Sequence, residues 1–373
     1  MTTVVGGSSL LDNAQHVAAL AGRHAVTAEA RRSPHPEVLG SLVASGFTRH
    51  FVPRRFGGAE GGFADLKAAV SIIGAECPAT AWCSVLAGLM ARTAGYLPPE
   101  GQRQVWSTGP DAFVVGGFAP RGTAEPVTGG WLLSGTWPLV TTAEYADWAL
   151  LAARVAGDAV TRIFVVSRTA MTVESTWDDI GMRATGSHTV RIDQVFVPVW
   201  MSFPFTDITE VRQPPVGSDG RAVPMLAVNV LVFCLPMLGA ARGALAHWER
   251  FAAAKLHTSD GSARAHLSGV YGRSSSEIDA AELILDRIIE VVDTAPVVTD
   301  TEVVRNTRDC AFAAELLVDA VDRLMRTSGS NGHSTSQPLQ RLWRDIHTAG
   351  AHAALQFGPA AVAYTTHHLT SPA

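Results

Sequence analysis

Near its C-terminus the chain reads Ser336-Gln337-Pro338-Leu339-Gln340-Arg341-Leu342-Trp343-Arg344-Asp345-Ile346-His347-Thr348-Ala349-Gly350-Ala351-His352. Ser336 is a suitable N-cap and Pro338 fits a first helical turn, so the stretch predicts the start of a helix. At about 100° per residue, Asp345 and His352 nearly eclipse on one helix face, with Thr348 between them. A carboxylate one repeat below an imidazole can orient the ring and raise its pKa, which suits a catalytic acid or base.

A solvated helix face would carry the same residues, and their spacing leaves both interpretations open. His347 lies five positions before His352 and about 140° away around the helix, so it is the weaker catalytic candidate. Nothing like a His-x-His or Glu/His pair surrounds His352, and we expect no metal site.

Composition indicates a soluble protein of two or three domains. The chain has 373 residues, of which 47% are hydrophobic and 17% are charged, and this composition suits large helix–helix interfaces within or between subunits. The net charge of −5 and the lack of a Lys/Arg cluster give no electrostatic footprint for nucleic acid. The scattered cysteines are expected to be reduced core residues: Cys77, Cys83, Cys234 and Cys310.

Neither a secretory signal nor a membrane span is expected. The N-terminus is polar and lacks a basic region, and the most apolar stretch, 223–241, contains Asn229 and two prolines. These features predict a cytoplasmic protein that does not bind membranes.

Three zones follow one another along the chain and predict an α+β fold that is mainly α. Residues 1–112 predict a helical N-terminal domain, with helices at 12–31, 36–45, 63–76 and 78–96. Residues 113–220 predict a central β-barrel or sandwich domain, with strands near 114–117, 131–135, 148–153, 162–166, 189–192 and 195–197. Residues 221–373 predict a C-terminal four-helix bundle, with helices at 228–255, 264–294, 301–327 and 337–358.

Three strings in this order resemble the acyl-CoA dehydrogenase fold over nearly the whole chain. The first is Val52-Pro53-Arg54-Arg55-Phe56-Gly57-Gly58, which resembles an early loop of that fold. The second is Gly117-Phe118-Ala119-Pro120-Arg121-Gly122, followed by Gly129-Gly130-Trp131 through Trp137. The third runs from Trp177 through Gly181-Met182-Arg183-Ala184-Thr185-Gly186-Ser187 to Pro198.

Within that fold the residue at position 352 separates two chemistries. Acyl-CoA dehydrogenases carry a glutamate base after an Arg-Asp pair in the bundle; here Arg344-Asp345 is followed by His352 and no carboxylate. A histidine there is similar to the group D flavin-dependent monooxygenases, which are two-component hydroxylases. The resemblance implies reduced FMN or FAD from a separate flavin reductase, O₂, a C4a-hydroperoxide, and oxygenation of a small aromatic or natural-product substrate. It also implies a homotetramer, or at minimum a homodimer.

The resemblance assigns the flavin contacts as well. Thr141, followed by Thr142, lies where the family has a hydroxyl near the flavin N5, and Phe118 and Trp137 would flank the isoalloxazine. Asn331, His333 and Ser334 would meet the ribityl or phosphate end, across a subunit boundary. Each group also has a purely structural interpretation. The threonines can simply end a strand, the two aromatic residues can pack in the core, and the segment with Asn331 can be a polar loop.

Two departures from those relatives concern the pocket. Many relatives have a substrate-facing histidine where this chain has Leu89 and Met90, and a hydroxyl where it has Val140. An acyl-CoA dehydrogenase with a relocated base, Glu249 or Asp279, therefore stays open, as does a flavin-free scaffold. No Gly-x-Gly-x-x-Gly opens a βαβ unit, so nicotinamide is not expected to bind this chain.

Overall fold

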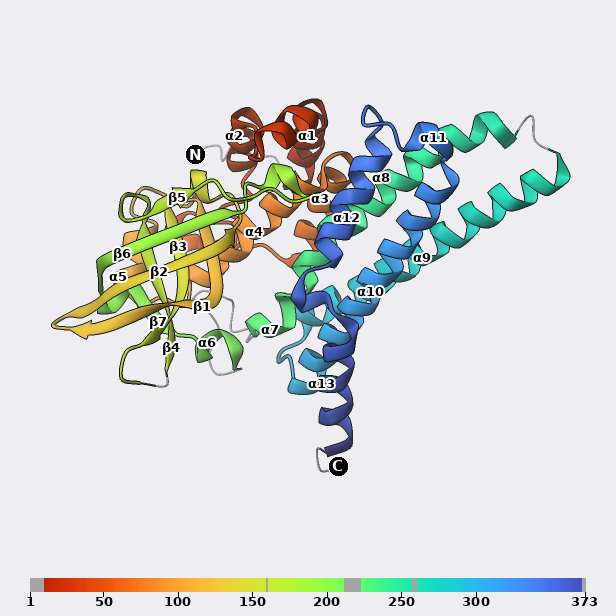
Figure 1. Cartoon of the computed structure of the whole chain (residues 1–373). Helices are drawn as coiled ribbons and strands as arrows, with labels where there is room; N and C mark the ends of the chain where they lie inside the picture. The colour runs from red at the N-terminus through yellow and green to blue at the C-terminus, as the bar shows by residue number, and fades with distance from the viewer. Residues whose placement is uncertain (1–9, 159, 211–222, 257–259, 371–373) are drawn as a thin grey trace, which may run out of the picture.

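Helices, then strands, then helices again make up the chain, in the order that the sequence predicts (Figure 1). The computed structural model describes residues 10–158, 160–210, 223–256 and 260–370. Before the strands come α1 (Leu10–Arg31), α2 (Pro36–Ala44), α3 (Phe63–Glu76), α4 (Pro78–Ala94) and α5 (Pro99–Val105). The order of the elements is therefore the predicted one, while the domain boundaries at 112 and 220 stay predictions.

The strands form one mixed sheet of seven strands in the order β5-β6-β2-β1-β3-β4-β7. Its members are β1 (Val114–Val127), β2 (Gly130–Val140), β3 (Trp148–Val155), β4 (Thr161–Ser167), β5 (Thr172–Glu174), β6 (His188–Pro198) and β7 (Ser202–Pro204). β1 runs parallel to β3, and the other neighbours are antiparallel. The short edge strands β5 and β7 leave little free backbone for pairing with another chain.

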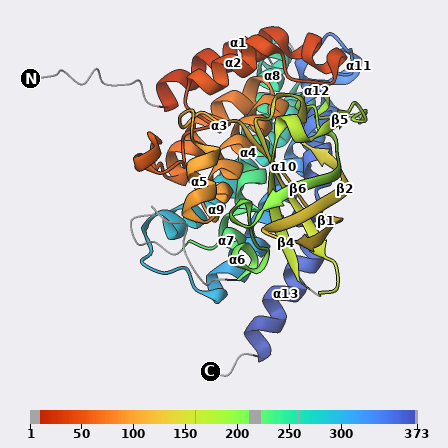
Figure 2. The same cartoon turned by 90° about the vertical axis from the view of Figure 1, so that its left-hand side faces the viewer.

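The helices after the sheet form the bundle and two projections from it. They are α6 (Thr206–Thr209), α7 (Met225–Val228), α8 (Leu231–Leu256), α9 (Gly261–Thr294), α10 (Asp300–Thr327), α11 (Gly329–Gly332), α12 (Pro338–Gly350) and α13 (Phe357–Thr370). One end of the α8–α9 pair extends away from the body (Figure 1). α13 projects from the body at the C-terminal end of the chain (Figures 1 and 2).

The expected helix at 337–358 is wrong at its C-terminal end. α12 stops at Gly350, His352 has an extended backbone with φ −58° and ψ 134°, and α13 begins only at Phe357. Gly350 is a poor helix former, and Pro359 would clash with a preceding carbonyl inside a continuous helix. A new start at Phe357 instead places Pro359 in a first turn, where its missing N–H costs nothing.

α8 is the central helix of the bundle and packs against α3, α4, α9, α10 and α12. α8 and α3 approach each other closely at two glycines: a Cβ added at Gly239 would lie only 2.7 Å from the Cα of Gly74. Among the described residues, the segment Met225–Ala253 is the one helix long and apolar enough to cross a membrane, and 78% of its most apolar window is buried inside the fold. These features identify it as a core helix.

The segment that precedes β6 is held against α12 by a close backbone contact. A Cβ added at Gly181 would lie 2.2 Å from the carbonyl oxygen of Arg344, so only glycine fits there without a shift. Arg344 also reaches back, donating from Nη1 to the carbonyl oxygen of Ile180 at 2.6 Å and pairing with Glu29 of α1. Three parts of the chain that are far apart in sequence therefore meet at this point.

We expect Gly181→Ala to lower the free energy of unfolding by about 1–3 kcal/mol, because the new methyl group must displace the backbone of α12. Gly272→Ala is the matched control: Gly272 lies in α9 with nothing within 4 Å of an added Cβ. That substitution should raise stability by up to about 1 kcal/mol through helix propensity. Denaturant unfolding of both variants measures the two effects, and equal changes would contradict the contact at Gly181.

Candidate active site

His352 lies against an aromatic wall formed by helices α4 and α8. Its ring centroid is 4.2 Å from that of Phe233 and 6.0 Å from that of Trp82. Trp82 and Phe233 themselves stack at 4.9 Å with their planes 22° apart. Because α12 ends before His352, the imidazole points from a break between two helices and not from a helix face.

The protonation state of His352 follows from its surroundings. The backbone N–H of Ala354 donates to Nδ1 at 3.2 Å, which places the proton of the neutral ring on Nε2. Burial lowers the pKa of His352 below the usual value, and no charged neighbour offsets that effect among the described residues. At neutral pH the ring is therefore uncharged and offers an Nε2–H donor.

A row of hydroxyl groups lies at the end of the sheet, where β2 and β6 begin to separate. Thr141 Oγ1 is 3.0 Å from Ser187 Oγ, which is 2.7 Å from Thr185 Oγ1. Cys83, next to Trp82 on α4, donates from Sγ to the carbonyl oxygen of Thr185 at 3.8 Å. The hydroxyl row and the aromatic wall thus share α4, which packs against β1 and α8.

The backbone around the hydroxyl row is strained. Six non-glycine residues among those described have positive φ, and three of them are Leu139 (63°), Thr142 (56°) and Met182 (54°). The first two flank Thr141, and the third precedes the turn Arg183–Thr185. Such conformations cost about 1–3 kcal/mol each and concentrate at functional sites.

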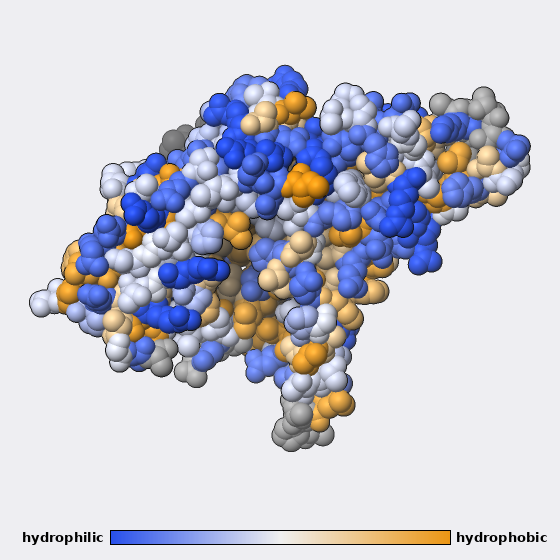
Figure 3. All heavy atoms as spheres, in the orientation of Figure 1, coloured by the Kyte–Doolittle hydropathy of each residue, from blue (hydrophilic) through white to orange (hydrophobic). Residues whose placement is uncertain are grey.

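A flavin fits the groups found here. The pairing of β1 with β3 breaks between Gly117 and Gly122, so the residues between them keep backbone N–H and C=O groups that the ladder does not use. Hydroxyls and free backbone groups suit the polar edge of an isoalloxazine, and aromatic rings suit its faces. Figure 3 shows the surface hollowed between the strand region and helices α12 and α13, with apolar side chains around the hollow.

Asp345 does not orient His352, contrary to the expectation from their spacing. Its carboxylate is buried and accepts a hydrogen bond from the backbone N–H of Met182 at 2.6 Å. The break after Gly350 removes the shared helix face on which the expected pairing with His352 depended. The expected rise in the pKa of His352 is also wrong, because burial lowers it.

His347 lies on the α10 side of α12 and is not brought to His352. Its Nδ1 is 2.8 Å from the carbonyl oxygen of Trp343, and its Nε2 is 3.4 Å from Asp322 Oδ1. Trp343 Nε1 donates to the same Asp322 oxygen at 2.8 Å. These contacts are those of a helix–helix packing residue.

Trp137 is a core residue of the sheet and has no surface left for a flavin. Its side chain is 1% exposed, its Nε1 donates to the carbonyl oxygen of Ala152 at 2.8 Å, and its ring lies over Gly122 and Gly135. Thr142 is also buried, and its backbone N–H donates to the carbonyl oxygen of Thr185 at 3.0 Å. Of the strand residues expected at the flavin, the partly buried Phe118 and Thr141 keep accessible surface.

The remaining expected residues lie away from this pocket. Asn331, His333 and Ser334 are exposed before the start of α12, whose 13 residues separate them from His352 by roughly 20 Å. The two candidate replacement bases, Glu249 on α8 and Asp279 on α9, are exposed as well, and Glu249 accepts from the Tyr271 hydroxyl at 2.6 Å.

Four residues of the pocket were missed by sequence reasoning: Trp82, Phe233, Thr185 and Ser187. Thr185 and Ser187 lie within the string from Trp177 to Pro198 and could have been found there as hydroxyls at a turn. The two aromatic residues gave no signal, because periodicity marks a buried face without saying which helix covers it. Leu89 and Met90 are both buried, and Met90 Sδ lies where a Cβ of Gly116 would be.

Known proteins that resemble this chain in sequence include flavin-dependent enzymes. Residues 231–357 match the family described as acyl-CoA dehydrogenase, C-terminal domain. The flavin-dependent monooxygenase oxygenase subunit HsaA of Rhodococcus jostii strain RHA1 is 29% identical over 91% of this chain and 92% of its own length. The FADH₂-dependent resorcinol hydroxylase oxygenase component of Rhizobium sp. strain MTP-10005 is also 29% identical, over 89% and 86%.

A solved structure with bound reduced flavin has the same fold. XiaF from Streptomyces sp., in complex with FADH₂ and glycerol, superposes with a TM-score of 0.86 at 26% identity, over 97% of this chain and 95% of that one. The acyl-CoA dehydrogenase fold and the similarity to flavin-dependent oxygenase components, both expected from the sequence, are thereby confirmed.

Asp345 provides a test, with a defined pH dependence, of the contact between α12 and the segment that precedes β6. Burial raises the pKa of Asp345 from 3.8 to about 6, so the folded state keeps a proton that the unfolded state releases as the pH rises. The stability from this proton is present below about pH 4 and is lost as the pH rises through about 6. We expect Asp345→Asn, which is always neutral, to gain about 1–3 kcal/mol relative to the parent between pH 4 and pH 7.

Denaturant unfolding at the two pH values measures that change. Any fixed cost of the unpaired amide cancels in the difference between them. Asp193→Asn, at an exposed position of β6, is the control for the loss of one negative charge. A stability difference for Asp345→Asn that does not change with pH would contradict the raised pKa.

Proposed function

We propose that this chain is the oxygenase component of a two-component flavin-dependent monooxygenase that hydroxylates a small aromatic substrate. The fold is that of the acyl-CoA dehydrogenases, and the curated relatives are hydroxylases and monooxygenase subunits that use reduced flavin. The overall reaction converts reduced flavin, O₂ and an aromatic C–H into oxidised flavin, water and a phenol. Reduced FMN or FAD comes from a separate flavin reductase and supplies the activation of O₂.

The observation that carries this proposal is a neutral imidazole, without a carboxylate, beside an aromatic wall. Dehydrogenation of an acyl-CoA requires a base at the reacting carbon, and the two candidate carboxylates, Glu249 and Asp279, are exposed on α8 and α9. Transfer of oxygen requires a dry aromatic pocket and a donor for the oxygen on which negative charge develops. His352, Phe233 and Trp82 supply those features.

The role assigned to His352 is hydrogen-bond donation from Nε2. Because Nδ1 already accepts from Ala354, the ring has no free lone pair with which to act as a base. A donor held by the backbone can stabilise developing charge without moving, and such donors contribute about 10²–10³ in rate. The aromatic wall would hold the substrate ring by stacking.

The hydroxyl row serves the cofactor in this proposal. Thr141, between two residues with positive φ, would hydrogen-bond the flavin N5, and Ser187 would fix its hydroxyl. Phe118 would contact the isoalloxazine. The exposed loop with Asn331, His333 and Ser334 would bind the ribityl or phosphate end of a flavin held by a neighbouring subunit, which requires a homotetramer or at minimum a homodimer.

A cytoplasmic location completes the proposal. The four cysteines are free and buried, as is usual in a reducing compartment. The burial of the apolar helix Met225–Ala253 inside the fold supports the same location.

Anaerobic titration and oxygen uptake test the activity. We expect the protein to bind reduced FMN or FADH₂ more tightly than the oxidised form and, with a phenolic substrate such as resorcinol, to consume O₂ and incorporate one ¹⁸O atom from ¹⁸O₂. A protein that binds no reduced flavin would be a flavin-free scaffold. Oxidation of an acyl-CoA with an artificial acceptor would instead identify a dehydrogenase.

Substitution of His352 tests its role. His352→Ala should lower the yield of hydroxylated product by about 10²–10³-fold, whereas His352→Gln, whose amide N–H can reach the Nε2 position, should lose about tenfold. Flavin affinity and melting temperature should change little in both variants. His347→Ala is the matched control and should keep the parent rate. Near-parent product formation by His352→Ala would place the donor elsewhere.

A further inference from the structure

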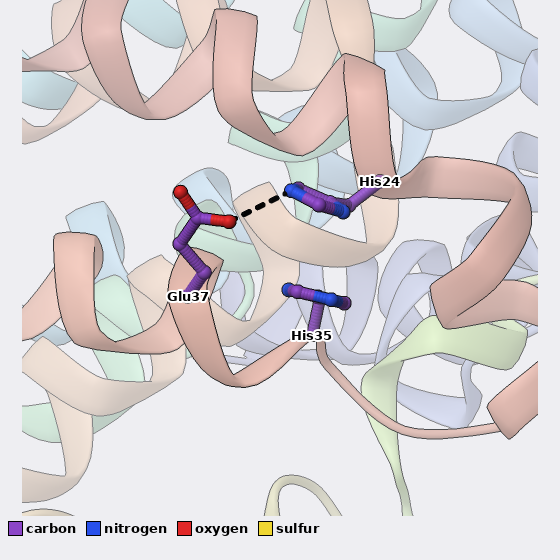
Figure 4. A group of neighbouring side chains, drawn as sticks. All are labelled: His24, His35 and Glu37. Carbon is purple, nitrogen blue, oxygen red and sulfur yellow. Dashed lines mark hydrogen bonds and ion pairs between the residues drawn. The ribbon is translucent and has the colours of Figure 1, made fainter.

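A second cluster of ligand-type side chains lies away from the aromatic pocket, where α1 meets α2 (Figure 4). His24 comes from α1, while His35 and Glu37 come from the start of α2. One possible ligand atom from each of the three lies within 4.8 Å of the others. Within the described part of the chain this is the one group of three His, Cys, Asp or Glu residues that meets that distance.

The contacts within the cluster hold the three side chains together. His24 Nε2 is 3.0 Å from Glu37 Oε2, and the two imidazole rings stack with centroids 3.7 Å apart and planes at 13°. Histidine binds metals through a ring nitrogen that carries no proton. His35 Nδ1 is buried and has no hydrogen-bond partner, so this ring has bonding capacity that the protein does not use.

The cluster adjoins the turn at Ser33 and Pro34, which contacts residues next to the hydroxyl row. Ser33 donates from Oγ to Glu144 Oε2 at 2.6 Å, and the Tyr145 hydroxyl donates to the carbonyl oxygen of Pro34 at 3.2 Å. A Cβ added at Gly186, the neighbour of Ser187, would lie 3.2 Å from Pro34. An ion held by His24 and His35 would therefore fix the turn at Ser33 and Pro34, next to the hydroxyl row.

We propose that His24, His35 and Glu37 bind one divalent transition-metal ion of the zinc class. Two imidazole nitrogens and a carboxylate oxygen form a ligand set that suits Zn²⁺ and Co²⁺, with water in the fourth position. A metal bound to an imidazole lies in the ring plane, so the two rings must turn out of their stack. Both histidines are only partly buried, which leaves room for that rotation. The site stands independently of the proposed flavin chemistry.

Metal titration of the full chain tests the site. Protein without an affinity tag is treated with a chelator and titrated with Zn²⁺ in competition with a chromophoric chelator. We expect one tight Zn²⁺ per chain, and His24→Ala or His35→Ala should raise its dissociation constant at least about tenfold. Saturating Zn²⁺ should raise the melting temperature of the parent but not of these two variants. Co²⁺ should give the d–d absorption of a four-coordinate site in the parent.

His16→Ala is the matched control, because His16 is an exposed histidine on the same helix, eight residues before His24. It should bind Zn²⁺ like the parent. Glu37→Gln removes an exposed ligand with little risk to folding, and it should weaken binding and change the Co²⁺ spectrum. The proposal is overturned if the His24, His35 and Glu37 variants bind Zn²⁺ as the parent does, or if the parent has no one-ion site below about 100 µM.

Discussion

The backbone N–H of Met182 donates to the buried carboxylate of Asp345, and the position of the candidate active site depends on this bond. Met182 precedes the turn that carries Thr185 and Ser187, so the bond places the hydroxyl row against α12. The same helix ends just before His352. Together with the contact of Gly181 with Arg344 and the hydrogen bond from Arg344 to Ile180, this bond holds the segment before β6 against α12.

Charge is concentrated at this junction and kept out of the pocket. Burial raises the pKa of Asp345 to about 6, even though Arg341 and Arg344 lie near enough to favour the ionised form. The pocket itself presents aromatic rings, hydroxyls and one neutral imidazole. A hydrogen bond is stronger in such a low-dielectric setting than in water, so an uncharged donor can suffice for catalysis there.

The sequence predicted the elements better than their contacts. The long helices were found almost to their ends, and the strings around Gly117 and Trp177 pointed to the correct fold. The strands were predicted too short: β1 extends to Val127 and β2 to Val140, and the two strands expected between 189 and 197 are the single strand β6. The face shared by Asp345 and His352 was wrong because Gly350 and Pro359, both visible in the sequence, divide that helix. Trp82 and Phe233 could not be foreseen, since their pairing depends on how α4 and α8 pack. The His24–His35–Glu37 cluster was missed for the same reason, as its members come from two helices.

His352 is placed by the backbone and by tilted contacts with aromatic rings, and no residue in the described part of the chain forms an ion pair with it. Its main-chain N–H donates to the carbonyl oxygen of Ala349, its Nδ1 accepts from Ala354, and Phe233 covers one face. A carboxylate–imidazole pair would weaken as dissolved ions screen its attraction, whereas aromatic contacts and backbone hydrogen bonds do not depend on that attraction. The orientation of this ring should therefore be insensitive to ionic strength, and the same pocket could operate unchanged in cells of very different salt content.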